Sequence, residues 1–191
     1  MTAASPADAK TLLRLQMRGR RKQLSAAAPE AGRQAAEQLP EVLLAQARIV
    51  AGYRPQGAEI DPWPVMQAFQ AAGAGLALPV ALDRTSALVF RAFRDGDPLI
   101  PDAFGIDAPA ANAPLVRPDL IITPLLAFDR AGARMGQGAG HYDRTIQALR
   151  GGQVFVLGLA FAGQEVARLP TETHDQPMDA ILTETRYIEA S

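Results

Sequence analysis

The sequence predicts an α/β fold with three layers, α/β/α, in which helices cover both faces of a mostly parallel β-sheet. Short apolar runs rich in Val, Ile, Leu and Phe recur along the 191 residues without clean alternation between apolar and polar positions. Runs of this kind are typical of strands buried on both faces. Helix-starting signals lie between them, which favours parallel strands joined by helices. The length and the 48% hydrophobic composition indicate one domain, residues 1–191, with a core that needs no disulfide.

The first predicted element is a basic N-terminal helix that begins at Ser5-Pro6-Ala7-Asp8 and extends to about Leu24. Serine suits the N-cap, proline the first helical position, and an acid the first turn. Six basic residues and no acidic one lie between Lys10 and Leu24. Helical spacing places most of these cations on one face and apolar side chains on another, so the helix is either solvated along its basic face or binds an anionic partner. The basic face is Lys10, Arg14, Arg18 and Arg21, and the apolar one is Leu13, Met17 and Leu24.

The remaining elements are predicted to alternate between strands and helices. A second helix is expected over 29–47, with a break near Pro40, and others over 62–73 and about 140–150. The segment 95–118 contains five prolines and is predicted to be a loop or arm outside the sheet. The predicted strands are 48–53, 75–80, 87–93, 119–123, 153–161 and 180–183.

Composition excludes several classes of function. Lys and Arg number 19 against 20 Asp and Glu, a net charge of −1, which argues against a protein that coats nucleic acids or membranes. The absence of cysteine excludes disulfides, thiolate metal sites and cysteine nucleophiles. No apolar run has the length of a membrane span or a signal peptide. We therefore expect a cytoplasmic monomer without a nucleic-acid or membrane partner.

A glycine-rich segment carries the most informative functional pattern. Three glycines at alternate positions lead into a predicted helix, so backbone amides are left uncovered beside the positive end of the helix dipole. Arg134 adds donors for phosphate oxygens, and Asp143 can present a carboxylate to a magnesium ion that the phosphates also hold. The pattern predicts phosphate binding, with a flexible turn as the alternative. The glycines are Gly136, Gly138 and Gly140.

Other glycine-containing motifs do not fit this segment. A dinucleotide fingerprint requires Gly-x-Gly-x-x-Gly directly after a strand, whereas eight residues, 128–135, separate these glycines from the preceding predicted strand. The sequence has no Gly-Lys-Ser/Thr, and no serine stands between glycines at the spacing of a hydrolase nucleophile elbow. Walker-type phosphate binding and serine hydrolysis are therefore excluded.

A polar segment near the C-terminus is the second candidate for function. Within 172–179 the chain has three acidic residues and His174, and the other histidine of the protein, His141, lies in the glycine segment. This segment is either a solvated turn or a loop that returns to the ligand-binding edge of the sheet.

Taken together, these residues resemble the 5-formyltetrahydrofolate cyclo-ligase family, also called methenyltetrahydrofolate synthetase, over nearly the whole chain. The glycine segment with its Tyr-Asp ending is the specific part, although Gln137, Ala139 and His141 depart from the usual Gly-Tyr-Gly-Gly-Gly-Tyr-Tyr-Asp. The matching residues are Lys10 and Arg14, Tyr53 and Glu59, Leu78-Pro79-Val80, Gly105-Ile106 with Pro109, the segment 132–143, and Pro170 with His174-Asp175.

The resemblance implies an ATP- and Mg²⁺-dependent ligase that cyclises 5-formyltetrahydrofolate to 5,10-methenyltetrahydrofolate and releases ADP and phosphate. It implies that Arg134 is catalytic, that Asp143 and Asp175 belong to the Mg²⁺ site, and that Tyr53 and Glu59 lie by the folate. The implied ATP-binding residues are Lys10, Arg14, Arg134, Met135, Gly136, Gln137, Gly138, Ala139, Gly140, His141 and Tyr142.

Three alternatives stay open at this point. A paralogue of the family could keep the ATP loop and act on another substrate. A nicotinamide-dependent oxidoreductase could use the same glycines, but it would require a strand running directly into them and an acid about 20 residues further on. A nucleic-acid-binding module could use the basic helix, although a content of 6% aromatic residues offers few side chains for base stacking.

Overall fold

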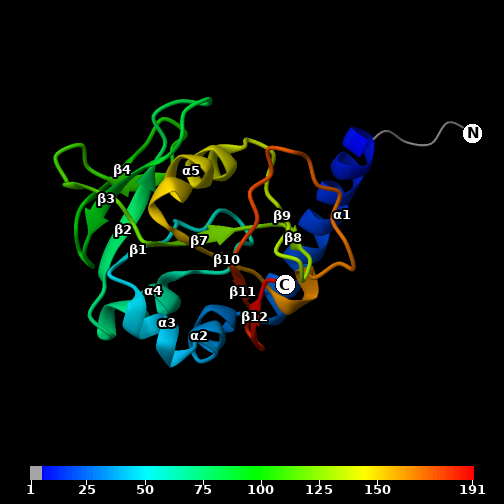
Figure 1. Ribbon diagram of the computed structural model, residues 1–191, viewed down its shortest axis with the longest axis horizontal. Helices are drawn as coiled ribbons and strands as arrows, with labels where there is room; N and C mark the ends of the chain where they lie inside the picture. The colour runs from blue at the N-terminus through cyan, green and yellow to red at the C-terminus, as the bar shows by residue number, and fades with distance from the viewer. Residues whose placement is uncertain (1–5) are drawn as a thin grey trace, which may run out of the picture.

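An eight-stranded mixed sheet forms the centre of the protein (Figure 1). The computed structural model describes residues 6–191, with side chains from Lys10 onward. The expected Ser5 cap and the Asp8 side chain therefore lie outside the described residues. The strand order is β12-β11-β10-β7-β1-β2-β3-β6.

The five strands in the middle of the sheet run parallel, as predicted. β1 lies between β2 and β7, so the chain order of the strands reverses there. Such a reversal leaves a crevice outside the carboxyl ends of the strands, where α/β proteins bind ligands. The parallel strands are β11 (Ala180–Leu182), β10 (Phe155–Leu159), β7 (Leu120–Pro124), β1 (Ile49–Ala51) and β2 (Gly75–Val80); those that pair antiparallel are β3 (Val89–Phe93), β6 (Leu115–Val116) and β12 (Tyr187–Glu189).

Helices cover both faces of the sheet, which confirms the predicted three layers (Figure 1). α5 (His141–Leu149) covers one face, and α2 (Ala31–Ala36), α3 (Glu41–Gln46) and α4 (Trp63–Ala71) cover the other. Successive side chains of a strand point to opposite faces. Accordingly, Leu120 and Ile122 belong to the core cluster that includes Phe69 of α4, whereas Ile121 belongs to the cluster that includes Ile146 of α5.

The N-terminal helix α1 (Pro6–Ala27) lies beside these layers and ends three residues later than predicted (Figure 1). Its buried Met17 packs in a third cluster with residues of the hairpin formed by β8 (Ala127–Phe128) and β9 (Arg134–Met135). Lys10 and Arg21 are buried on the same side as Met17, whereas Arg18 is exposed. Lys10 and Arg21 of the predicted basic face therefore point into the protein beside the apolar face, whereas Arg18 of the same predicted face does not.

Several short elements differ from the prediction. The expected helix over 29–47 forms α2 and α3, with the predicted break at Pro40. The prediction that 95–118 lies outside the sheet is wrong at β6, which pairs with β3. The same segment forms a separate ribbon of β4 (Leu99–Pro101) and β5 (Asp107–Pro109). Proline is tolerated in such edge strands because their outer N–H groups have no ladder partner, and strands of two or three residues are too short to show periodicity.

Candidate active site

A cleft of about 390 Å³ opens at the carboxyl ends of β2, β1 and β7, where the strand order reverses. Pro79, Tyr53 and Pro124 line it from these three strand ends. The cleft is closed laterally by α1, by the glycine segment and by the loop that contains His174. The structure brings every predicted site residue to this one cleft: Lys10, Arg14, Tyr53, Glu59, Arg134, Met135, Gly136, Gln137, Gly138, Ala139, Gly140, His141, Tyr142, Asp143 and Asp175.

The glycine segment forms a cradle of backbone donors. Gly138 and Gly140 have φ angles of 107° and 70°, a left-handed conformation that favours glycine, and Gly140 is the N-cap of α5. Ala139, the residue that replaces a family glycine, has no such positive φ. Among the described residues, none of the backbone N–H groups from Gly136 to Asp143 has an acceptor in the protein. With the positive end of the α5 dipole beside them, these donors suit a phosphate group.

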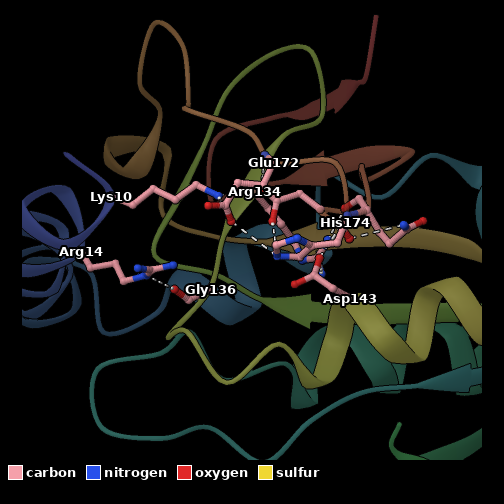
Figure 2. Close-up of polar contacts among 9 residues, drawn as sticks. Lys10, Arg14, Arg134, Gly136, Asp143, Glu172 and His174 are labelled. Atoms are coloured by element: carbon pink, nitrogen blue, oxygen red, sulfur yellow. Dashed lines mark hydrogen bonds and ion pairs between the residues drawn. The ribbon is translucent and has the colours of Figure 1, made fainter. Parts of the chain in front are cut away.

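The helix α1 contacts the cradle from one side. Arg14 Nε donates to the carbonyl oxygen of Gly136 at 3.4 Å, a contact visible in Figure 2. Arg18 Nε donates to Gln137 Oε1 at 3.1 Å. Residues 122 and 119 positions apart in the chain thus meet at the rim of the cleft, and the cations of α1 are added to the donors of the cradle.

Arg134 is a clamped cation in the wall of the cleft. Its side chain is only 4% exposed, and Nη2 donates to Asp143 Oδ1 at 2.7 Å (Figure 2). Nη1 donates to the carbonyl oxygen of Gln176, whose own N–H donates to Asp143 Oδ1 at 3.0 Å. Burial lowers the pKa of Arg134, whereas the Asp143 carboxylate favours the charged form. Arg134 therefore ties β9, the first turn of α5 and the His174 loop together.

Lys10 makes the corresponding contact from α1. Its Nζ lies 2.9 Å from Asp175 Oδ2 and 3.0 Å from Glu172 Oε2. Burial acts to lower the pKa of Lys10, but the two carboxylates outweigh it and leave the pKa raised. For Asp175, burial acts to raise the pKa, but Lys10 and the N–H of Glu172 outweigh it, so the pKa is lowered. Lys10 is therefore a buried cation that is already paired with the carboxylates of Glu172 and Asp175.

Three side chains of the same loop could hold a metal ion. Glu172, His174 and Asp175 each offer a ligand atom, and these atoms all lie within 4.8 Å of one another. Asp143, the other predicted metal ligand, is bonded to Arg134 instead. Glu172 and His174 lie in the polar segment 172–179 but were not among the predicted metal ligands. Carboxylate oxygens suit Mg²⁺, and here one oxygen each of Glu172 and Asp175 also accepts from Lys10.

The predicted folate residues lie in the segment after β1 and line the same cleft. Tyr53 is buried, its hydroxyl donates to the carbonyl oxygen of Ile60 at 2.7 Å, and burial raises its pKa well above the usual value. The phenol therefore stays neutral, and its hydroxyl hydrogen is already donated. Glu59 is bound by Arg21, whose Nη1 lies 3.2 Å from Oε1. Burial raises the pKa of the neighbouring Tyr142 as well.

Sequence reasoning missed several residues of the cleft. Arg21 was placed on the basic face of the helix without a role, although its helical spacing to Lys10 and Arg14 was a usable signal. Phe104 comes from the arm that was expected to lie apart from the sheet, and its ring lies 5.3 Å from the ring of His141. The arm therefore contributes an aromatic wall. Further missed lining residues are Arg54, Gln56, Leu88 and Asp102.

Comparison with known proteins gives a consistent result. Residues 6–184 match the 5-formyltetrahydrofolate cyclo-ligase family. The 5-formyltetrahydrofolate cyclo-ligase of Haemophilus influenzae is 36% identical over 142 residues, 72% of this chain and 76% of that protein. The enzyme of the same name from Escherichia coli K12 is 33% identical over 168 residues, 84% of this chain and 91% of that protein.

Solved structures agree in fold. The NMR structure of Aquifex aeolicus 5,10-methenyltetrahydrofolate synthetase superposes with a TM-score of 0.74 at 26% identity, and the match covers 95% of this chain and 92% of that one. The synthetase from Mycoplasma pneumoniae has a TM-score of 0.71 at 19% identity over 92% of this chain and 98% of that one, which shows a shared fold.

Proposed function

Because this chain belongs to the 5-formyltetrahydrofolate cyclo-ligase family, we propose that it is an ATP-dependent carbon–nitrogen ligase that converts 5-formyltetrahydrofolate to 5,10-methenyltetrahydrofolate. One observation supports this function above the others. A single cleft holds a cradle of backbone N–H groups without acceptors among the described residues, three cations from two segments and a cluster of carboxylates. The cations are Lys10, Arg14 and Arg134.

The chemistry explains why a phosphate site belongs beside the folate. The formyl group on N5 is amide-like, and its oxygen is a poor leaving group. In the proposed reaction the formyl oxygen attacks the γ-phosphorus of ATP, the bond to the β-phosphate oxygen breaks, and ADP leaves. N10 then attacks the activated carbon and loses its proton, and phosphate departs with the former formyl oxygen.

The protein acts in this scheme by positioning and by neutralising charge. We propose that residues 134–142 bind ATP together with Lys10 and Arg14, and that Arg134 stabilises the phosphate charge during transfer. No step requires a protein nucleophile, so the absence of cysteine is compatible with the reaction. The folate is proposed to lie beside Glu59 and Tyr53, which line the same cleft.

We propose Mg²⁺ as the metal that accompanies ATP. The residues present suit Mg²⁺, because Glu172 and Asp175 offer carboxylate oxygens within 4.8 Å of each other and Asp143 lines the same cleft. When bound, Mg²⁺ would neutralise negative charge on the ATP phosphates. Lys10 contacts the same carboxylates, so binding requires this lysine to share them or to move to a phosphate oxygen.

The proposal includes a cytoplasmic monomer that functions as one domain over residues 1–191. No helix in the described range 6–191 is long and apolar enough to cross a membrane. The burial of Lys10 and Arg21 removes two cations from the surface that a nucleic-acid-binding helix would use.

A direct assay tests the function. Purified protein is mixed with 5-formyltetrahydrofolate, ATP and Mg²⁺, and the ultraviolet absorbance of the methenyl product is followed. We expect product only in the complete mixture, with none when ATP is omitted or when the divalent metal is chelated. ATP hydrolysis without methenyl product would indicate a paralogue that uses another substrate and would contradict the proposal.

A further inference from the structure

A buried ion pair links α1 to the folate end of the cleft. Arg21 Nη1 lies 3.2 Å from Glu59 Oε1, and the two side chains are 7% and 6% exposed. The same Nη1 is 3.4 Å from the carbonyl oxygen of Leu125, which follows β7. The second carboxylate oxygen of Glu59 accepts from the N–H of Gln56 at 2.9 Å. One guanidinium thus bridges the ends of β1 and β7, where the strand order reverses.

Stability is a weak explanation for this pair. Removing two charges from water is unfavourable, and apolar pairs of similar volume are often as stable as buried ion pairs or more stable. Arg21 also has a buried Nε without a hydrogen-bond partner among the described residues, so part of its donor capacity is unused. Because Arg21 does not use all of its hydrogen-bond donors, its contact with the Glu59 carboxylate is a better explanation for its presence.

Glu59 borders two cavities. It lines the main cleft and also a second cavity of about 210 Å³ on its other side, between the end of α1 and the start of α2. Arg21 lines only the main cleft of these two. Arg21 binds Oε1 of Glu59 from the main cleft, so the ion pair holds the carboxylate beside that cleft. Each oxygen retains a lone pair, so the carboxylate can still accept from an N–H donor of a ligand.

We propose that Arg21 is a positioning residue for the substrate, which holds the Glu59 carboxylate toward the N–H groups of the bound folate. The inference rests on the proposed function and adds to it a residue of α1 that acts at the folate end. It also separates the cations of α1 by task. Lys10 and Arg14 contact the cradle and the His174 loop, whereas Arg21 contacts the loop after β1.

The test compares Arg21→Met with Arg20→Met in steady-state kinetics, because Arg20 is an exposed cation on the same helix. We expect Arg21→Met to raise the KM for 5-formyltetrahydrofolate about 10- to 100-fold, the loss of one charge-assisted contact, and to change the KM for ATP less than about twofold. Arg20→Met should resemble the wild type. Arg21→Lys keeps the charge and should recover part of the folate affinity, and it provides the measurement if the methionine variant does not fold.

A double-variant cycle with Glu59→Gln identifies the partner. If Arg21 acts through Glu59, the folate KM of the double variant will be close to that of the worse single variant. Multiplicative effects on the folate KM would show that Arg21 acts independently of Glu59, and an equal rise in the KM for ATP would show a general effect on α1. Either result would overturn the inference and leave the proposed function intact. A wild-type protein without turnover in the same assay would overturn the proposed function, and the inference with it.

Discussion

Replacing Arg134 by methionine removes the cation that joins three segments of the cleft and retains the apolar part of the side chain. The change eliminates the hydrogen bonds from Arg134 to Asp143 Oδ1 and to the carbonyl oxygen of Gln176. Hydrogen bonds to charged groups contribute about 1.5–3 kcal/mol each. The Asp143 side chain is 25% exposed, so water can compensate in part. We therefore expect the free energy of unfolding to fall by about 2–4 kcal/mol.

Urea unfolding followed by circular dichroism measures this change, and Arg130→Met is the matched control. Arg130 also pairs with a carboxylate, that of Glu165 at 2.8 Å, but its side chain is 65% exposed. Exposed pairs contribute about 0–1 kcal/mol, so the control should lose less than about 1 kcal/mol and keep its activity. For Arg134→Met we also expect kcat/KM to fall at least about tenfold.

Equal free energies of unfolding for the Arg134 and Arg130 variants would refute the argument that burial gives the Arg134 pair its importance. A second check uses Arg134→Met combined with Asp143→Asn. Removing both charges leaves no uncompensated carboxylate, so the double variant should be less destabilised than the sum of the single variants. Strict additivity would show that the two side chains do not depend on each other.

Three further predictions address separate features. Arg14→Ala should raise the KM for ATP or lower kcat, and Arg20→Ala should do neither; equal ATP kinetics for both would remove Arg14 from the site. Gly132→Ala should lower the midpoint of thermal unfolding far more than Gly136→Ala. A Cβ at Gly132 (φ 82°) would lie 2.6 Å from a backbone oxygen, whereas a Cβ at Gly136 would meet nothing within 4 Å. Similar unfolding midpoints for the two variants would contradict this prediction. Arg130 holds the pKa of Glu165 below its usual 4.5, so the charged carboxylate stabilises the fold above pH 4.5 and this effect is lost as the pH falls through the lowered pKa. Glu165→Gln should therefore lower the free energy of unfolding by less than about 1 kcal/mol at pH 7 and should not change it in acid. A difference in unfolding free energy that stays constant with pH would refute this prediction.

The sheet and the glycine segment were predictable because both depend on local patterns. Apolar runs identified β2 and β7 within one residue at either end and β10 within two. The glycines were predictable because positive φ at Gly138 and Gly140 restricts the residue type. The strand order and the short β6 and β12 were not predicted, because pairing partners distant in the sequence leave no local signal.

The ion-pair partners of the site residues could not be predicted from the sequence either. Helical spacing showed that Lys10 and Arg21 share a side of α1, but it could not show that this side faces inward. Whether a cation is free or paired depends on side chains brought together by the fold. Lys10 meets Asp175, which is 165 residues away, and Arg21 meets Glu59 across 38 residues. The family resemblance suggested that the site residues share a ligand, and the structure added which of them contact each other.

The destination of the formyl oxygen provides the most direct test of the central claim, that one cleft places ATP against the formyl group of the folate. The substrate would carry ¹⁸O in its formyl group, and the released phosphate would be examined by ³¹P NMR after turnover with unlabelled ATP and water. We expect one ¹⁸O atom in each phosphate, because the formyl oxygen attacks the γ-phosphorus and leaves with it. Unlabelled phosphate, with the ¹⁸O recovered in water, would show that ATP does not activate the formyl oxygen and would contradict the account.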